Sequence, residues 1–235
     1  MTPGTLKVEV LETAEAVAQR SAQLLVDSLR ETAQQRGRAS FAVSGGRTPA
    51  LMLRFVAAAA LPWERLDLFQ VDERVAPAGH ADRNAEGVRK AFAQQCELHP
   101  ERFHWMPVEQ PDLAAGARTY ASELAAVAGE PAMLDVIHLG LGDDGHTASI
   151  FPGAATTNDA ASDVTVTGVH LGRRRMTLTM AAINRARLIV WVVTGREKQL
   201  ALAKLLAGDP TLVASRVRRT GVTVLADSAA AGSAL

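Results

Sequence analysis

The sequence predicts an α/β fold, with a mostly parallel sheet and helices on both of its faces. Short apolar runs rich in β-branched residues alternate with longer amphipathic patterns along the chain. Several of the short runs are apolar on both faces, as expected for central parallel strands that helices cover from each side. No internal repeat or long linker divides the chain, so we expect residues 1–235 to form a single domain.

The predicted strands are short, apolar and bounded by polar or glycine-containing segments. The order β-α-β-α implies right-handed crossovers between neighbouring parallel strands. The predicted strands cover residues 6–11, 39–43, 66–71, 134–140, 164–171, 176–180, 187–193 and 222–226.

The predicted helices carry apolar residues at helical spacing. The first covers residues 14–37, with Val17, Leu25 and Leu29 among its apolar positions and Gly37 as its stop. The alanine-rich end of the chain, residues 227–235, is expected to fray. Further helices are predicted over residues 49–60, 84–95, 113–128 and 197–208.

Composition excludes several classes of function. The 25 basic and 25 acidic residues balance, which argues against binding nucleic acid through a general positive field but leaves a local anion site open. Cys96 is the single cysteine, so no internal disulfide is expected, and its place at a predicted helix end does not favour a nucleophile. The sequence shows no secretory signal pattern and no long apolar run, so we expect a cytoplasmic protein with no membrane partner.

The loop after the predicted strand 39–43 reads "SGGRTPALML". Glycines let the backbone approach a ligand closely, and a following helix N-terminus favours an anion. Thr48 is a candidate helix cap, with Pro49 in the first turn, and Ser44 and Arg47 are further donors. The pattern is not a Walker A loop, which needs Gly-Lys-Ser/Thr. It fits a phosphate cradle and an ordinary strand-to-helix turn equally well.

The segment "DERVAP" follows the next predicted strand, 66–71. Ligands bind beyond the carboxyl ends of the strands in open α/β sheets, so this loop and the preceding one belong to the same edge. Arg74 could bind an anion or orient Asp72 and Glu73. A solvated turn with a local ion pair is the alternative.

The segment "GLGDDGHTASIFPG", residues 140–153, begins as Gly-x-Gly-x-x-Gly. A dinucleotide-binding turn needs a helix of several turns after the third glycine, but Pro152 and Gly153 stop any helix early. Asp143 and Asp144 would also repel a pyrophosphate. The segment therefore does not favour dinucleotide binding.

The same segment places Asp144 two residues before His146, at the end of the predicted strand 134–140. A histidine beside a carboxylate can act as a general base near neutral pH, and Gly142 keeps the approach open. A satisfied loop histidine is the alternative. His138 falls inside the predicted strand and is expected to be a core histidine. No Cys or His pair with zinc-ligand spacing surrounds His146, so no metal site is expected.

The segments "SGGRTP", "DERVAP" and "LGLGDDGHTASIFPG", in this order, resemble the 6-phosphogluconolactonase family, and the resemblance extends through "RRRMTLTMAAINRARLIVWVVTGREKQLALAKLL". It implies a Rossmann-like fold similar to that of glucosamine-6-phosphate deaminases and ribose-5-phosphate isomerases. It also implies hydrolysis of 6-phospho-D-glucono-1,5-lactone to 6-phosphogluconate, the second step of the oxidative pentose phosphate pathway, without a metal or organic cofactor.

The resemblance also implies roles for individual residues. His146 matches the proposed general base and Asp144 the acid before it. The residues it implies for substrate binding, together with neighbours in the same loops, are Ser44, Gly45, Gly46, Arg47, Thr48, Asp72, Glu73, Arg74, Gly142, Arg175 and Lys198.

The chain departs from the family pattern at three places. Arg47 and Arg83 stand where the family often has serine, and "GRRR" replaces an approach that contains proline. Arg175 is preferred over Arg173 and Arg174 as the phosphate ligand because of its spacing to "TLT".

Two other functions remain open from the sequence. A glucosamine-6-phosphate deaminase typically has Asp-Glu-Tyr in place of Asp72-Glu73-Arg74 and a further acid after the Gly-His pair, which this chain lacks. A sugar-phosphate-binding regulator without catalysis would not need the Asp144–His146 pair. The expected partner is a small sugar-phosphate lactone, with no nucleic acid, and the chain is expected to be a monomer or a weak homo-oligomer.

Overall fold

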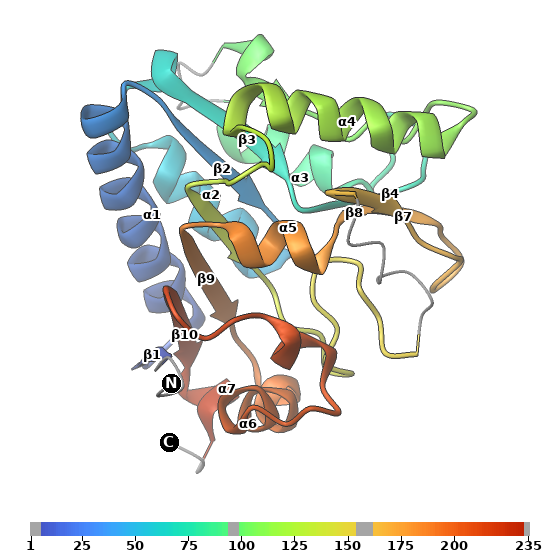
Figure 1. Cartoon of the computed structure of the whole chain (residues 1–235). Coiled ribbons are helices and arrows are strands. Elements are labelled where there is room, and N and C mark those ends of the chain that lie inside the picture. Colours follow the sequence, from blue (N-terminus) through green and yellow to red (C-terminus); the bar gives the residue numbers. More distant parts are fainter. Residues whose placement is uncertain (1–5, 94–98, 154–161, 233–235) are drawn as a thin grey trace.

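A computed structural model of the chain describes residues 6–93, 99–153 and 162–232. Within these residues, seven parallel strands form the large sheet and three antiparallel strands form a small one (Figure 1). The order across the large sheet is β1 (Lys7–Leu11), β10 (Val222–Asp227), β9 (Leu188–Val193), β6 (Val136–Leu139), β2 (Ala39–Val43), β3 (Leu66–Gln70) and β5 (Phe103–His104).

Helices cover both faces of the large sheet, as the sequence predicts (Figure 1). The helices α1 (Ala14–Arg36), α2 (Arg47–Ala57) and α3 (Asn84–Phe92) pack on one face. The helices α4 (Leu113–Ala128), α5 (Met180–Arg185) and α6 (Gln199–Ala207) pack on the other. The short α7 (Ser228–Ala231) follows β10.

The strands divide their side chains between these two cores by simple alternation. In β2, Phe41 and Val43 belong to the core under α1–α3, whereas Ala42 belongs to the core under α4–α6. In β9, Val190 faces the first core and Trp191 faces the second. Successive strand residues point to opposite faces, so runs that are apolar throughout fill both cores. The predicted fold class is confirmed.

The small sheet departs from the predicted organisation. Residues 72–74, expected as a loop, form β4 (Asp72–Arg74), which pairs antiparallel with β8 (Arg175–Leu178). The strand predicted over residues 164–171 is shorter in the structure: β7 covers Val164–Val166 and pairs with β8 only. The sequence predicted residues 164–171 and 176–180 as strands of the large sheet. A local pattern does not show which strand is the pairing partner, so the sequence could not predict a separate sheet.

The long helices were predicted accurately from the sequence, whereas the shortest elements were not. Helices α1 and α4 match the predicted ranges to within one residue. The short β5, α5 and α7 were missed, because two to six residues give too few positions for a period. Cys96 and part of the predicted helix 84–95 lie outside the described residues. No described helix is long and apolar enough to cross a membrane.

Candidate active site

The carboxyl ends of the central strands meet around a cavity of about 160 Å³, the site cavity. Its walls come from the residues that follow β2 and β6, from β4 and β8, and from the segment before α6. The topology explains this convergence, because parallel strands all end at the same edge of the sheet. The residues that line the site cavity are Ser44, Gly45, Asp72, Arg74, Asn84, Gly140, Leu141, Gly142, His146, Ala148, Arg175 and Lys198.

His146 and Asp144 form a hydrogen-bonded pair at this cavity. The ring Nδ1 of His146 lies 2.6 Å from Oδ1 of Asp144, and the backbone amide of His146 donates to the same oxygen at 3.0 Å. Partial burial alone would raise the pKa of Asp144, but these hydrogen bonds from His146 outweigh burial, and the pKa lies below its usual range. Asp144 is therefore ionised at neutral pH. It leaves Nε2 as the ring nitrogen free to exchange a proton in the cavity.

The close approach of the backbone to the imidazole requires glycine at position 142. A Cβ on Gly142 would lie 2.1 Å from Nδ1 of His146 and 2.6 Å from Oδ1 of Asp144. Both distances are far inside van der Waals contact. Gly142 therefore makes room for the His146–Asp144 pair.

Two arginines face each other across the small sheet. Arg74 of β4 and Arg175 of β8 are direct cross-strand partners, and both line the site cavity. The Nε of each is buried without a hydrogen-bond partner among the described residues. Burial, and then the charge of Arg74, lower the pKa of Arg175 below its usual value, while Asp72 opposes the shift. Like charges directly opposite each other destabilise a strand pair, and an anion between them would relieve this repulsion.

Asp72 lines the site cavity but is held by protein groups. Its Oδ2 accepts a 2.6 Å hydrogen bond from the hydroxyl of Ser149, and Asn84 donates its amide to the Asp72 backbone oxygen at 2.9 Å. Gly45 lies against Asn84: a Cβ on Gly45 would lie 1.9 Å from Oδ1 of Asn84. Asp72 thus holds Asn84, which also lines the cavity, and Ser149, which does not.

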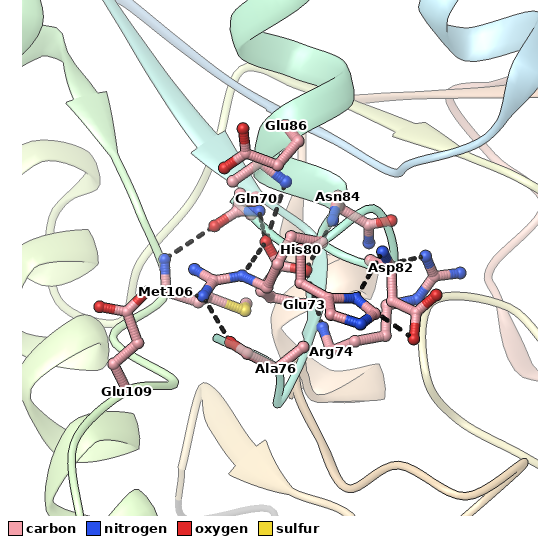
Figure 2. A network of polar contacts seen from close by, with 12 residues as sticks. Gln70, Glu73, Arg74, Ala76, His80, Asp82, Asn84, Glu86, Met106 and Glu109 are labelled. Atoms are coloured by element: carbon pink, nitrogen blue, oxygen red, sulfur yellow. Dashed lines mark hydrogen bonds and ion pairs between the residues drawn. The ribbon is translucent and has the colours of Figure 1, made fainter. Parts of the chain in front are cut away.

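The structure corrects the expectation for Glu73. Its side chain is fully buried and lines no part of the site cavity. Its oxygens accept backbone amides from Arg74, Asn84 and Ala85 at 2.7–2.9 Å, and its carboxylate pairs with Arg83 at 3.2 Å (Figure 2). Glu73 therefore satisfies the N-terminus of α3 instead of touching substrate. Alternation along β4 explains why Asp72 and Arg74 face the cavity and Glu73 does not.

The loop after β2 reaches the cavity only with its first residues. Ser44 donates its amide to Nδ1 of His138 and its hydroxyl to the His138 carbonyl, both at 3.3 Å. Gly46 and Arg47 line an adjoining cavity of about 320 Å³, which shares Ser44, Gly45, Arg74 and Asn84 with the site cavity.

The structure tests the predicted helix cap at Thr48 and the predicted core position of His138. Gly46, not Thr48, is the N-cap of α2, and the hydroxyl of Thr48 lies 2.6 Å from that of Thr194, so Thr48 lines neither cavity. The expected helix cap is therefore wrong. His138 is a core histidine as expected, and burial lowers its pKa to about 3.

The three consecutive arginines at the start of β8 have different surroundings. Arg175 lines the site cavity, Arg173 pairs with Asp82 at 2.9 Å, and Arg174 is exposed. The sequence preference for Arg175 agrees with this placement. Lys198 lies just before α6 and completes the positive side of the cavity.

Asn84 and Phe151 were not among the predicted site residues. The ring of Phe151 lies 4.6 Å from that of His146 and 5.0 Å from the guanidinium carbon of Arg175. Phe151 belongs to the same segment as His146, which was the available signal, and Asn84, at the start of α3, directly follows Arg83, where the chain departs from the family pattern. Among the described residues, no three His, Cys, Asp or Glu side chains are grouped as metal ligands.

Comparison with known proteins places this site in a family. The family model for glucosamine-6-phosphate isomerases/6-phosphogluconolactonase matches residues 12–225. A 6-phosphogluconolactonase of Synechocystis sp. is 36% identical over 207 residues, which cover 86% of each chain. The structure of a 6-phosphogluconolactonase from Trypanosoma cruzi superposes with a TM-score of 0.87 at 25% identity, covering 99% of this chain and 98% of the other.

A monomeric glucosamine-6-phosphate deaminase shares the fold at 22% identity, with a TM-score of 0.84 over 96% of this chain and 99% of the other. The family match extends over nearly the whole chain and includes all the segments that line the site cavity. The chain therefore belongs to the glucosamine-6-phosphate isomerase/6-phosphogluconolactonase family.

Proposed function

We propose that this chain is a 6-phosphogluconolactonase in which His146 is the general base. The reaction is hydrolysis of 6-phospho-D-glucono-1,5-lactone to 6-phosphogluconate, the second step of the oxidative pentose phosphate pathway. The names of the curated relatives support the activity. The observation that carries the choice of base is the 2.6 Å contact between His146 and Asp144 at the rim of a basic cavity.

The phosphate group of the substrate would bind among Arg74, Arg175 and Lys198, close to the Ser44–Gly45 backbone. The cross-strand arginine pair supports this placement, because an anion between the two guanidinium groups relieves their repulsion. The dianion also supplies acceptors for the buried guanidinium donors. Phosphate binding then directs the lactone ring toward His146.

The proposed steps use one proton carrier. Neutral His146 takes a proton from water through Nε2, and the resulting hydroxide adds to carbonyl carbon C1. Backbone amides or an arginine stabilise the tetrahedral oxyanion. The bond between C1 and the ring oxygen then breaks, and the imidazolium returns its proton to that oxygen. The new carboxylic acid releases one proton to solvent, so atoms and charge balance.

Asp144 supports both halves of this cycle. Its ionised carboxylate stabilises the imidazolium and keeps the tautomer with the proton on Nδ1 when the ring is neutral. Such a base typically contributes about 10²–10⁴-fold to the rate. We expect the loss of His146 to reduce turnover and the loss of a phosphate ligand to weaken binding.

A coupled assay tests the proposal. The lactone is generated in situ near neutral pH, product is trapped with 6-phosphogluconate dehydrogenase, and spontaneous hydrolysis is subtracted. We expect His146→Ala to lower kcat by about 10²-fold or more with KM nearly unchanged. His99→Ala, at an exposed histidine away from the cavity, is the control and should match wild type.

Two results would contradict parts of the proposal. If folded wild type does not accelerate hydrolysis, the lactonase assignment fails, and glucosamine 6-phosphate becomes the next substrate to assay. If His146→Ala retains full turnover, the activity stands but the base is another group, with Asp72 and Asp144 the next candidates.

We also propose that the chain is a single cytoplasmic domain that works as a monomer or a weak homo-oligomer. Sedimentation of the purified protein over a range of concentrations checks the oligomeric state.

A further inference from the structure

Three groups that carry or can gain positive charge surround the ring of Phe151. His170 stacks on it with ring centroids 3.6 Å apart and an interplanar angle of 20°. His146 lies 4.6 Å away at 41°, and the guanidinium carbon of Arg175 lies 5.0 Å from the ring centroid. Phe151 itself is only 5% exposed. The negative faces of an aromatic ring attract such groups at these distances.

The imidazole of His146 has little else to hold its plane. Its side chain is 29% exposed, and its ring makes one hydrogen bond, to Asp144, among the described residues. The backbone of Gly142 closes one side, where even a methyl group would not fit. Phe151 supplies the ring surface against which the imidazole packs. The torsion about the Cβ–ring bond is broad in histidine, so packing of this kind restricts the ring's rotation.

His170 lies between β7 and β8, where it pairs through its backbone with Arg173 at 2.9 and 3.2 Å. Arg173 in turn donates to Asp82 at 2.9 Å and 3.1 Å. This chain of contacts ties the hairpin to the segment after β4. His170 therefore reaches Phe151 from an anchored position.

We propose that Phe151 is a positioning residue for His146, and that His170 clamps the Phe151 ring against it from the β7–β8 hairpin. The ring keeps the imidazole plane aligned so that Nδ1 meets Asp144 and Nε2 faces the cavity.

Variants at Phe151 test the first half of the proposal, which rests on His146 as the base. Phe151→Leu removes the ring face while keeping an apolar side chain of similar size. We expect kcat to fall about tenfold, part of the ~10²–10⁴-fold effect of a general base, while KM stays within about twofold of wild type. The melting temperature of the variant is measured beside wild type to verify that it folds.

Variants at His170, which is half-buried, test the clamp without opening the core. We expect His170→Ala to lower kcat about threefold and His170→Phe to restore it to near wild type, because the second variant keeps the stacked ring. If both variants lose the same activity, the clamp by stacking is wrong. This pair also carries the test if Phe151→Leu fails to fold.

Nuclear magnetic resonance of the His146 ring in the free protein separates this proposal from the choice of base. We expect Phe151→Leu and His170→Ala to change the ring 15N shifts toward a mixture of tautomers, and His170→Phe to leave them unchanged. Unchanged ring shifts and unchanged kcat in folded Phe151→Leu would overturn the proposal. Altered His146 ring shifts in Phe151→Leu, together with loss of activity in His146→Ala, support the proposal. Full activity in His146→Ala refutes only the choice of base.

Discussion

The two edges of the large sheet treat buried charge in opposite ways. At the amino ends of the strands, Asp67 is paired with Arg38, Arg102 and His104, at 2.8–3.2 Å. Asp135 at the same edge pairs with Arg36 and Arg187. Every buried acid there meets more than one cationic group. These clusters belong to the structural framework.

The carboxyl edge is positively charged without such matching. Arg74 and Arg175 face each other across the small sheet, and each has a buried Nε without a partner among the described residues. Asp72, the acid that lines the same cavity, is already hydrogen-bonded to Ser149 and Asn84. The amino edge pairs its buried acids with cationic groups, whereas the carboxyl edge places two cationic groups opposite each other. Cationic groups that face each other beside a cavity therefore mark a candidate binding site better than charge alone.

The largest effect should come from adding a side chain at Gly142, where the backbone lies against His146 at the carboxyl edge. In Gly142→Ala the new methyl group would lie 2.1 Å from Nδ1 of His146 and push the imidazole away. We expect kcat to fall about 10²-fold, since misplacement of a catalytic group by about 1 Å costs that much. Steady-state kinetics measure this loss. Gly168→Ala is the control, because a Cβ there meets nothing within 4 Å, and equal losses in both variants would contradict the prediction.

Removing one arginine from each edge should have different effects at the two edges. Arg175→Gln should raise KM about 10- to 100-fold, because phosphate loses one charged hydrogen-bond donor. The melting temperature should stay equal or rise, because the repulsion between Arg74 and Arg175 is removed. Arg38→Gln should lower the melting temperature and leave KM unchanged, because Arg38 pairs with Asp67.

Steady-state kinetics and thermal melts of both variants check this contrast. A clear fall in melting temperature for Arg175→Gln would mean that the carboxyl edge does not hold unmatched charge. An effect of Arg38→Gln on KM would break the division of roles between the two edges.

A smaller effect concerns the pH dependence of stability at the amino edge. Burial opposes ionisation of Asp67, but its hydrogen bonds to His104 and Arg38 prevail and lower its pKa to about 2. The stabilisation is present above the unfolded pKa of about 3.9 and is lost as the pH falls toward 2. At about 1.4 kcal/mol per unit, wild type should lose about 2 kcal/mol of unfolding free energy in this window.

Urea unfolding between pH 5 and 2 measures this loss. Asp67→Asn, which cannot ionise, should be less stable at pH 5 and should show a smaller decline toward pH 2. An unchanged decline would assign the acid sensitivity to other carboxylates, while KM at neutral pH should match wild type in either case.

Much of the framework follows from the sequence alone. The apolar runs at 39–43 and 187–193 read correctly as central strands, because alternation of side chains between two covered faces makes every position apolar. The pairing of Asp144 with His146 was also predictable, since two residues in one short loop cannot lie far apart.

Tertiary structure decided the rest of the site. Whether Asp72 or Glu73 faces the cavity depends on β4 pairing with a strand about a hundred residues later, and no local pattern encodes that register. The same pairing placed Arg175, which the sequence already favoured over its two neighbours, directly opposite Arg74. Long-range packing also brings three further residues close to the site cavity: Asn84, Phe151 and His170. The apolar runs and the polar residues that follow them were enough to predict which loops lie at the candidate site, because both are local features of the sequence. Which side chains face the cavity, and what holds them, depends on contacts between distant segments, such as the antiparallel pairing of β4 with β8.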